Sequence, residues 1–498
     1  MKISITIFIN LAFITLALAQ QIALPLEKNN DQKVTSYAEL TTFIQLLDES
    51  SDMLKVETIG KSVQGRNLYA MKYSSSEFGM DESKIKVLFF AQQHGNEQSG
   101  KEGALLLAQA LMLPENKYLF DKIDLAIIPQ MNPDGSEVNN ERNANNVDLD
   151  CNHLTLSEPE TRALHHFFDT YLFDVTLDVQ ETTAYGADLE KSGYRNNLNE
   201  MFGGTTNLNV AEEIRELSNN FIIPYLLKYM SDRNFTATEY YHGRAHETDY
   251  FRKSTFDSNN GSQSFGIFNT VSLFQVGMNG KDNDLDNIKH RAEAQMTGMR
   301  GMLEFAFKFK DGLLRYVVAE RAKLLTSNRD QKVAIQMEHT PNGQKLSIPL
   351  FSSATNNDTL LVINDYRPVV KSVYDVQKPA GYLIPKKYKD LMKWADNQAL
   401  TSIKFKNQKG QQIEQYVIKS LDSIDFEGDM IMDPTVESKL LGHNIMACRY
   451  VYIPTSQLKG NMLVIALEPK SMLGLATYKQ YTHLLKRGKF PVLRVVKK

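Results

Sequence analysis

The chain has 498 residues, 42% of them hydrophobic, enough to bury a large core and to form two domains rather than one. This composition excludes a disordered or fibrous protein. The 56 Lys and Arg nearly balance the 59 Asp and Glu, leaving a formal net charge of -3. The charge therefore gives no reason to expect nucleic acid or an anionic membrane as a partner.

Residues 1–19 have the pattern of a secretory signal peptide. Lys2 supplies a short positive start, Ile3 to Leu18 is mostly apolar, and the small residues up to Ala19 form a cleavage site. The alternative is a membrane anchor, but polar residues interrupt the run and it is short for a span. We expect a mature chain from Gln20, secreted or periplasmic, and no later membrane span.

From about residue 50 to 310, strand-length apolar runs alternate with segments of helical period. Nearly continuous apolar strands are typical of a sheet covered on both faces, so the sequence predicts an α/β fold with a mixed, mostly parallel sheet between helices. The four clearest strand runs are Lys86 to Ala91, Leu125 to Ile128, Val175 to Val179 and Thr270 to Val276. Ser157 and Glu160, around Pro159, predict a capped helix start at Ser157.

After a helical stretch around Arg315 to Leu325 the pattern becomes β-rich. We therefore place one domain at residues 20–325 and a smaller β-rich domain at 330–498, with a helix around Lys387 to Ala395. The expected strands are Val333 to Met337, Leu360 to Ile363, Ile413 to Ile418, Tyr450 to Ile453, Leu463 to Leu467 and Val492 to Val496. Cys151 and Cys448 lie far apart in sequence, and we expect no disulfide between them.

Polar motifs follow the predicted strands, where the chemistry of an open α/β sheet is expected. Gln93-His94-Gly95-Asn96-Glu97 comes directly after the first strand run. His94 and Glu97 are a usable zinc pair at a junction between strand and helix, although His-x-x-Glu alone is most often a surface pair. Asn132-Pro133-Asp134-Gly135 alone would only be a turn.

Read in order, these motifs resemble the zinc carboxypeptidases of the carboxypeptidase A superfamily. The resemblance covers roughly residues 40 to 310 and continues through Pro159 to Leu164, Leu177 to Val179 and Gln263 to Ile267. Gly381 to Pro385 and Leu467 to Pro469 further resemble an accessory C-terminal domain of a bacterial branch of that family.

The resemblance implies one zinc ion held by two histidines and a glutamate, a glutamate general base, and arginines that bind the terminal carboxylate of a peptide. Zinc lowers the pKa of water and polarises the carbonyl, while the glutamate moves the proton. His94 and Glu97 match the first two ligands. The third matches Gln180 in Asp178-Val179-Gln180, and an amide oxygen is a poor replacement for imidazole.

The general base of the family falls at Val276, or at Gln275 one residue earlier. Neither side chain can take a proton, and general acid-base catalysis is worth a factor of about 10²–10⁴. The Asn-Arg pair of the family falls at Asp150 and Cys151, which cannot make the guanidinium contact with a carboxylate. Arg142 resembles the upstream arginine, although a solvent-facing loop arginine is an equal alternative.

Other side chains could in principle supply the missing ligand. His242 and His246 have a spacing that would face one way on a helix, but His242-Gly243 indicates a loop. Glu181 adjoins Gln180 and should point to the opposite sheet face. No base paired with Cys151 is visible, so we do not expect a cysteine nucleophile.

The leading hypothesis is a secreted zinc-carboxypeptidase relative that is impaired in hydrolysis and binds peptides or cell-wall fragments, with weak zinc binding. The alternative is an active metallocarboxypeptidase with replacement ligands, which an additional His, Asp or Glu aimed at His94 and Glu97 would favour. In a third hypothesis the C-terminal domain carries the role through protein contacts. A large exposed apolar patch on that domain would favour it.

Overall fold

The computed structural model describes residues 22–183, 191–243, 250–279, 285–326, 331–406, 410–441 and 445–497. The predicted signal segment, residues 1–19, and His246 lie outside the described residues. Within the described ranges, no helix has the length and apolar character needed to cross a bilayer.

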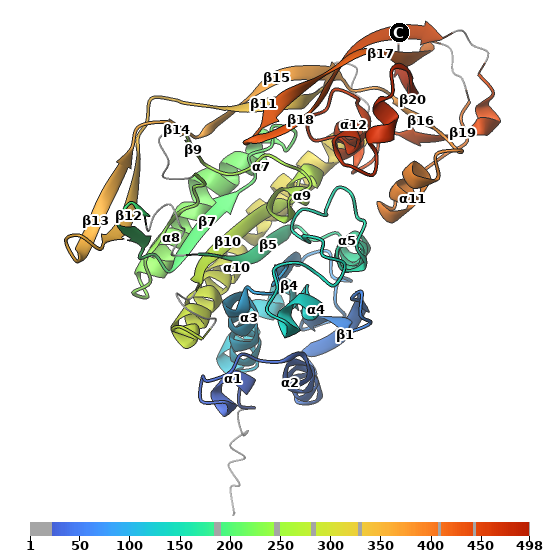
Figure 1. Cartoon of the computed structure of the whole chain (residues 1–498). Helices are drawn as coiled ribbons and strands as arrows, with labels where there is room; N and C mark the ends of the chain where they lie inside the picture. Colours follow the sequence, from blue (N-terminus) through green and yellow to red (C-terminus); the bar gives the residue numbers. More distant parts are fainter. Residues whose placement is uncertain are drawn as a thin grey trace, which may run out of the picture.

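The centre of the molecule is an eight-stranded mixed sheet in the order β1-β2-β4-β3-β5-β10-β7-β8 (Figure 1). The pairs β4–β3, β3–β5 and β5–β10 are parallel, as the nearly continuous apolar strands predicted, and the outer pair β1–β2 is antiparallel. The predicted α/β fold class is therefore confirmed. The strands are β1 (Leu54–Lys61), β2 (Asn67–Tyr73), β3 (Ile85–Ala91), β4 (Ile123–Ile128), β5 (Val175–Thr183), β7 (Glu200–Gly204), β8 (Ala237–Glu239) and β10 (Val271–Asn279).

Helices cover both faces of this sheet. On one face, α3 (Gln98–Leu111) and α10 (Ile288–Leu325) pack on β5 and β10. On the other face, Phe265 lies between Phe90 of β3 and Phe168 of α5 (Pro159–Tyr171), with ring centroids 5.8 Å and 4.4 Å apart. The other α-helices that the structure describes in this half are α1 (Pro25–Lys28), α2 (Tyr37–Glu49), α4 (Pro133–Glu137), α7 (Glu212–Leu217), α8 (Ile223–Ser231) and α9 (Gly261–Ser264).

The predicted capped start of α5 is wrong in detail. The helix begins at Pro159 with Glu158 as its N-cap residue, and no side chain caps it. The Ser157 hydroxyl instead contacts the Glu158 carboxylate and the Asn152 amide, so a local hydrogen-bond network holds it outside the helix.

The C-terminal half is β-rich, as predicted, and lies across one end of the sheet (Figure 1). Its longest feature is the β17–β18 hairpin, which belongs to a five-stranded sheet in the order β18-β17-β20-β16-β19. The strands are β11 (Lys332–Thr340), β12 (Leu346–Ser352), β13 (Asn357–Ile363), β14 (Tyr366–Arg367), β15 (Val369–Gln377), β16 (Gly381–Pro385), β17 (Gln411–Phe426), β18 (Asp429–Leu441), β19 (Tyr450–Pro454) and β20 (Gly488–Lys497).

One predicted strand of this half is wrong. Leu463 to Leu467 belongs to helix α12 (Gly460–Leu467), whose eight residues are all buried. A short run that is apolar on every side has no period, so sequence alone cannot separate a buried strand from a buried helix. The predicted helix near residue 390 is present as α11 (Lys389–Asn397).

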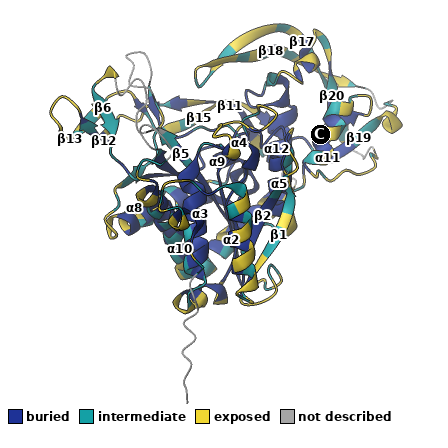
Figure 2. Ribbon diagram, turned by 60° about the horizontal axis from the view of Figure 1, so that its bottom comes forward, coloured by how far each residue is buried: buried dark blue, intermediate teal, exposed yellow. Residues whose placement is uncertain are grey.

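The two halves share one core. Strand β12 pairs with β6 (Tyr194–Asn196), and β14 pairs with β9 (Phe251–Arg252), so strands on either side of residue 330 hydrogen-bond to each other. Trp394 of α11 is buried and donates to the Leu154 carbonyl at 2.8 Å. Figure 2 shows this continuity, with buried residues running from the central sheet through α12 and exposed residues along the β17–β18 hairpin.

Candidate active site

The site begins in the loop that follows β3. Gly95 packs so closely on the Gly135 backbone that a Cβ would lie 2.2 Å from its carbonyl carbon, so only glycine fits. Asn132 fixes the partner loop, because its side chain accepts from Gly135 N at 2.9 Å and donates to Gln93 O at 3.1 Å. The predicted Asn-Pro-Asp-Gly turn is thus the start of α4 and a support for the His94 loop.

His94 and Glu97 come together as predicted. His94 Nδ1 lies 2.8 Å from Glu97 Oε1, and His94 Nε2 lies 3.0 Å from Asp148 Oδ1. Burial disfavours the imidazolium, but the charges of Glu97 and Asp148 outweigh it and raise the pKa of His94 to about 12. A carboxylate on the far nitrogen is the usual orienting partner of a metal-binding histidine.

Glu97 fits the role of a metal ligand. Its carboxylate is buried, burial raises its pKa to about 7, and Oε2 has no hydrogen-bond partner among the described residues. A buried acceptor without a partner is costly, and a cation or a water would satisfy it. His94 and Glu97 would therefore hold zinc, which when bound would polarise a carbonyl or activate a water.

Gln180, at the position of the third ligand, is engaged in a different network. Its amide nitrogen donates to Asp150 Oδ1 at 3.0 Å and to Asp178 Oδ2 at 2.8 Å. The Gln93 amide donates to the same two oxygens at 3.2 Å and 3.0 Å. The donor end of Gln180 thus serves two buried carboxylates.

Burial is the main cause of the raised pKa values of Asp150 and Asp178. It raises the pKa of Asp150 to about 6, and it raises the pKa of Asp178 well above the usual range, with a further contribution from Asp150. Gln93 also contacts a second buried pair. Its Oε1 accepts from His153 Nε2 at 2.7 Å, and His153 Nδ1 lies 3.0 Å from His165 Nε2. Burial lowers the pKa of both histidines, so both are neutral.

The strand register separates the two candidates for the general-base position. Val276 of β10 pairs with Gln180 of β5, so both side chains lie on the same sheet face. Gln275 points to the opposite face, where its amide donates to Gln295 O of α10 at 2.9 Å. Val276 is buried in an apolar cluster with Leu198, Met201, Phe274 and Met278.

Arg142 and Cys151 are the remaining residues that the family resemblance assigned to the site. Arg142 is exposed, and its guanidinium donates to Asn146 O at 3.5 Å. Cys151 and Cys448 are free thiols, as predicted. Desolvation and the nearby Asp150 and Asp148 raise the pKa of the Cys151 thiol, which leaves it neutral and unsuited to nucleophilic attack.

Glu181 points away from Gln180, as predicted, and accepts from Ser99 of α3 and from Arg291 of α10. His242 lies in a loop, with a backbone bridge to Arg252. It lines the cavity described below.

Glu141 and Asp148 belong to none of the motifs that predict the site from the sequence. Ligand atoms of His94, Glu141 and Asp148 all lie within 4.8 Å of one another, and the three residues could hold a metal ion on the Nε2 side of His94. Their signal in the sequence is an acidic residue on each side of segment 142–147. The loop folds back so that both acidic side chains lie near His94.

A cavity of about 370 Å³ extends from Gln180 to the C-terminal half. This volume lies in the range of small-ligand pockets. Three residues from the end of the β17–β18 hairpin contribute to its wall. The lining residues are Asp150, Cys151, Gln180, Tyr240, His242, Arg252, Ser254, Thr255, Asp257, Asn260, Ser262, Phe274, Phe426, Glu427 and Asp429.

An α/β sheet with a His-x-x-Glu pair directly after an inner strand is the arrangement that the resemblance to zinc carboxypeptidases predicts. The sequence profile of the zinc carboxypeptidase family matches residues 40–187, which include His94, Glu97 and Gln180. The match confirms the resemblance to the zinc carboxypeptidase family over this segment of the chain.

Similarities to individual proteins extend beyond this segment. The chain is 23% identical to Carboxypeptidase 2 of Trichophyton tonsurans, over 84% of this chain and 78% of that protein. It is also 23% identical to Carboxypeptidase 2 of Trichophyton rubrum, over 88% and 82%. A solved metallo-carboxypeptidase from Burkholderia cenocepacia is 18% identical, with a TM-score of 0.43 over 55% of this chain and 69% of that one. The bacterial branch remains a prediction.

Proposed function

We propose that this chain is a peptide-binding relative of the zinc carboxypeptidases, with impaired hydrolysis and weak zinc binding. The observation that carries the proposal is Val276, because it lies beside Gln180 on the site face and is packed among apolar side chains. A hydrolase of this class needs a base at the bound water, and a valine cannot accept a proton.

The ligand set supports the same function. His94 and Glu97 supply two protein ligands, whereas the nitrogen of the Gln180 amide is committed to Asp150 and Asp178. Structural and catalytic zinc sites normally use three or four protein ligands. The adjoining cavity, with aromatic and polar walls, has the character of a ligand pocket.

Metal analysis tests this proposal. We expect well below one zinc per chain after the protein is dialysed against metal-free buffer, and calorimetry should show a weak zinc isotherm. Peptide binding, measured by calorimetry, should persist in the presence of a chelator. One tightly held zinc per chain would contradict the proposed weak site.

The second candidate function is an active metallocarboxypeptidase with replacement ligands. The observation that favours it is the grouping of His94 with the carboxylates of Glu141 and Asp148. This candidate predicts that Glu141→Gln abolishes zinc binding, because it removes one of the three ligands, whereas a site built on His94 and Glu97 alone would lose little.

We also propose that residues 1–19 are removed on export and that the mature protein is secreted or periplasmic. The mass of the purified native protein should correspond to a chain beginning at Gln20. A mass that includes Met1 to Ala19 would contradict this.

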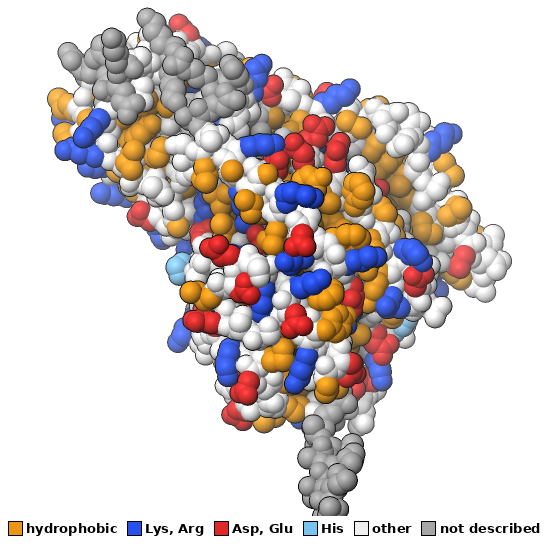
Figure 3. Space-filling view, turned by 180° about the vertical axis from the view of Figure 1, so that it is seen from behind, with side chains coloured by type: hydrophobic (Ala, Val, Ile, Leu, Met, Phe, Trp, Pro, Cys, Tyr) orange, Lys and Arg blue, Asp and Glu red, His pale blue; other side chains and the backbone are white. Residues whose placement is uncertain are grey.

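Acidic and basic side chains are interspersed on the face seen in Figure 3, so that face has no single-sign patch to attract a polyanion.

A further inference from the structure

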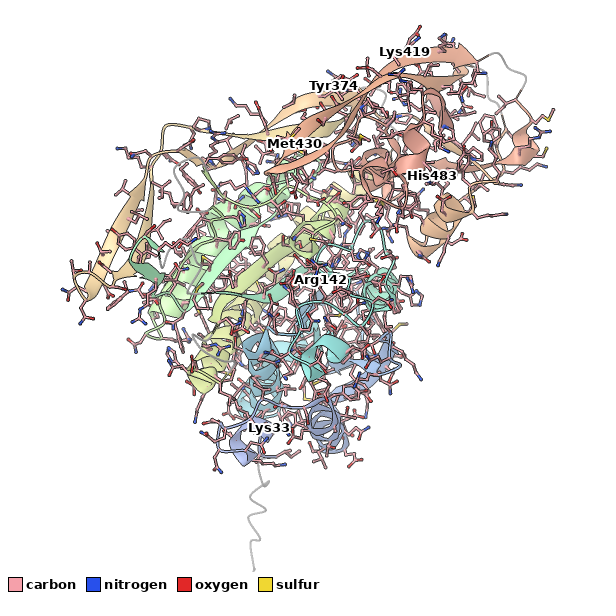
Figure 4. All side chains as sticks on the ribbon, viewed as in Figure 1. Lys33, Arg142, Tyr374, Lys419, Met430 and His483 are labelled. Carbon is pink, nitrogen blue, oxygen red and sulfur yellow. The ribbon has the colours of Figure 1, made fainter. Side chains whose placement is uncertain are left out.

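The distal part of the β17–β18 hairpin, residues 419–436, is a two-stranded arm that leaves the C-terminal sheet. Strand β17 pairs with β20 from Gln411 to Ile418, whereas its pairing with β18 continues to the turn. In Figure 4, Lys419 marks the start of the arm and Met430 lies beside its tip. Most residues of the arm are exposed, so few buried contacts hold it in place.

The base of the arm combines an irregularity with a fixed point. A register shift between Ile418 and Ser420 leaves Lys419 as an extra residue of β17, which is a β-bulge. Close to this bulge, Asp433 of β18 accepts from Lys470 Nζ at 2.6 Å. Bulges bend a strand and interrupt its hydrogen-bond ladder, so the arm can bend here while its base stays anchored.

The tip of the arm is held by Glu427. Its Oε1 lies 3.0 Å from His339 Nε2 and its Oε2 lies 2.9 Å from Arg252 Nη2, and the three side chains are between 1% and 11% exposed. Burial disfavours the carboxylate, but the hydrogen bond from His339 and the charge of Arg252 outweigh it and lower the pKa of Glu427. Phe426 adds a ring contact with Phe256 at 5.6 Å. The tip is therefore attached to segments from both halves of the chain.

Glu427 occupies this position against its backbone preference. Glu427 and Gly428 are the central residues of the turn, and both have positive φ, 54° and 102°, as in a type I′ turn. Asparagine and glycine are favoured at the first of these positions, whereas a glutamate is strained at positive φ. Strained residues persist when the surrounding structure fixes them, and they gather at clamps and switches. The side-chain contacts of Glu427, and not the turn, account for a glutamate here.

The tip of the arm also forms one side of the cavity beside Gln180. Phe426, Glu427 and Asp429 line this cavity together with residues of the N-terminal half, among them Asp150 and Gln180. Displacement of the tip would remove three lining residues at once. The contacts of Glu427 therefore decide whether the cavity is covered on this side.

We propose that the arm is a lid over this cavity, which opens by bending near the bulge at Lys419 and closes when Glu427 contacts Arg252 and His339. The inference goes beyond the proposed function, because it concerns access to the cavity and holds for any ligand that enters it. Its tests need no ligand, so failure of peptide binding and failure of the lid are distinguishable.

Hydrogen exchange of the mature protein tests the contact at the tip. Glu427→Asn removes the charged contact with Arg252 and His339, yet it creates Asn-Gly, the most favourable pair for this turn. We expect the backbone amides of residues 423–432 to exchange at least tenfold faster than in the wild type. Those of residues 411–418, which pair with β20, should change less than twofold. A glutamate that served the turn alone would give the opposite result, slower exchange in the asparagine variant.

Two further variants control for side-chain length and charge. Glu427→Gln keeps the length, removes the charge and should also accelerate exchange of residues 423–432, which covers the case in which Glu427→Asn does not fold. Asp425→Asn removes a charge from an exposed position of the same arm and should exchange like the wild type. Unchanged or slower exchange of the arm in folded Glu427→Asn, or in Glu427→Gln if the asparagine variant does not fold, would overturn the inference.

Hydroxyl-radical labelling tests whether the arm covers the cavity. Tyr240 lines the cavity, and its ring centroid lies 4.9 Å from that of Phe274. Tyr118 is exposed elsewhere on the surface and is the internal reference. We expect labelling of Tyr240 relative to Tyr118 to rise at least threefold in the folded Glu427 variant and to stay at the wild-type level in Asp425→Asn. If exchange of the arm rises but labelling of Tyr240 does not, the arm moves without uncovering the cavity and is not its lid.

Discussion

Asp150 and Gln180 show why single residues decide the chemistry of this site. At these positions a zinc carboxypeptidase would carry groups that bind a substrate carboxylate and a metal ion, whereas here an amide bridges two carboxylates. The network is closed by Gln93, so the replacement is part of an ordered buried structure. Among the described residues Asp178 Oδ1 has no hydrogen-bond partner, so the network is ordered but not fully satisfied.

We predict that Gln180→His strengthens zinc binding. The new imidazole would be the third protein ligand beside His94 and Glu97, and zinc should approach one ion per chain after dialysis. Gln180→Leu, which removes the amide without adding a ligand, is the control and should bind no more zinc than the wild type. Equal zinc content in the histidine variant and the wild type would show that position 180 does not face the metal.

We predict that Val276→Glu lowers the free energy of unfolding by about 2–5 kcal/mol at pH 8, because it places a carboxylate among apolar side chains. Burial raises the pKa of such a group, so the destabilisation should shrink as the pH falls through that pKa and the carboxyl becomes neutral. Urea unfolding at pH 5 and pH 8 measures this. Val276→Ala gives the loss of packing alone, and a pH-independent result equal to that control would contradict the prediction.

The sequence identified most of the candidate site, because its motifs are local. His94, Glu97 and Gln180 could be placed from the segments around them, and the strand register then selected Val276 over Gln275. The pairing of Arg252 with Glu427 in the cavity wall could not be found in this way. The two residues lie 175 positions apart (427 − 252), and a contact of that range has no local pattern.

At the scale of elements, sequence periodicity predicted the inner strands of the sheet well, because strands buried on both faces are continuous apolar runs. It failed at α12, where a helix surrounded by core on every side gives the same kind of run. The start of α5 was misplaced because Ser157 bonds to its neighbours in a loop instead of capping the helix.

Helix α11 links the C-terminal half to the loop beneath the site. Trp394 and Gln398 both donate to the Leu154 carbonyl at 2.8 Å, next to His153. We predict that Trp394→Ala destabilises the protein by about 3–5 kcal/mol, since a fully buried indole is removed. Chemical denaturation measures the change, and Lys393→Ala on the same helix is the control. A loss below about 1 kcal/mol would mean that α11 is not firmly docked.

At the scale of the whole molecule, the proposed boundary between the two domains lies near residues 325–330. Strand pairs and a continuous core nevertheless cross it. We therefore predict that both halves unfold in one cooperative transition. Scanning calorimetry should show a single peak, and tryptophan fluorescence from Trp394 should change at the same temperature as the far-UV signal. Two resolved transitions would indicate that the halves are independently stable.

The central claim is that the native chain binds peptides but does not hydrolyse them appreciably. The direct measurement is release of free amino acids from a set of peptides by the purified mature protein, with added zinc and with a chelator. We predict no release above the buffer control in either condition. Gln180→His should restore metal without substantial turnover, because zinc and base act as a unit. Release by the unmodified protein that the chelator abolishes would contradict this account and favour a metallocarboxypeptidase with replacement ligands.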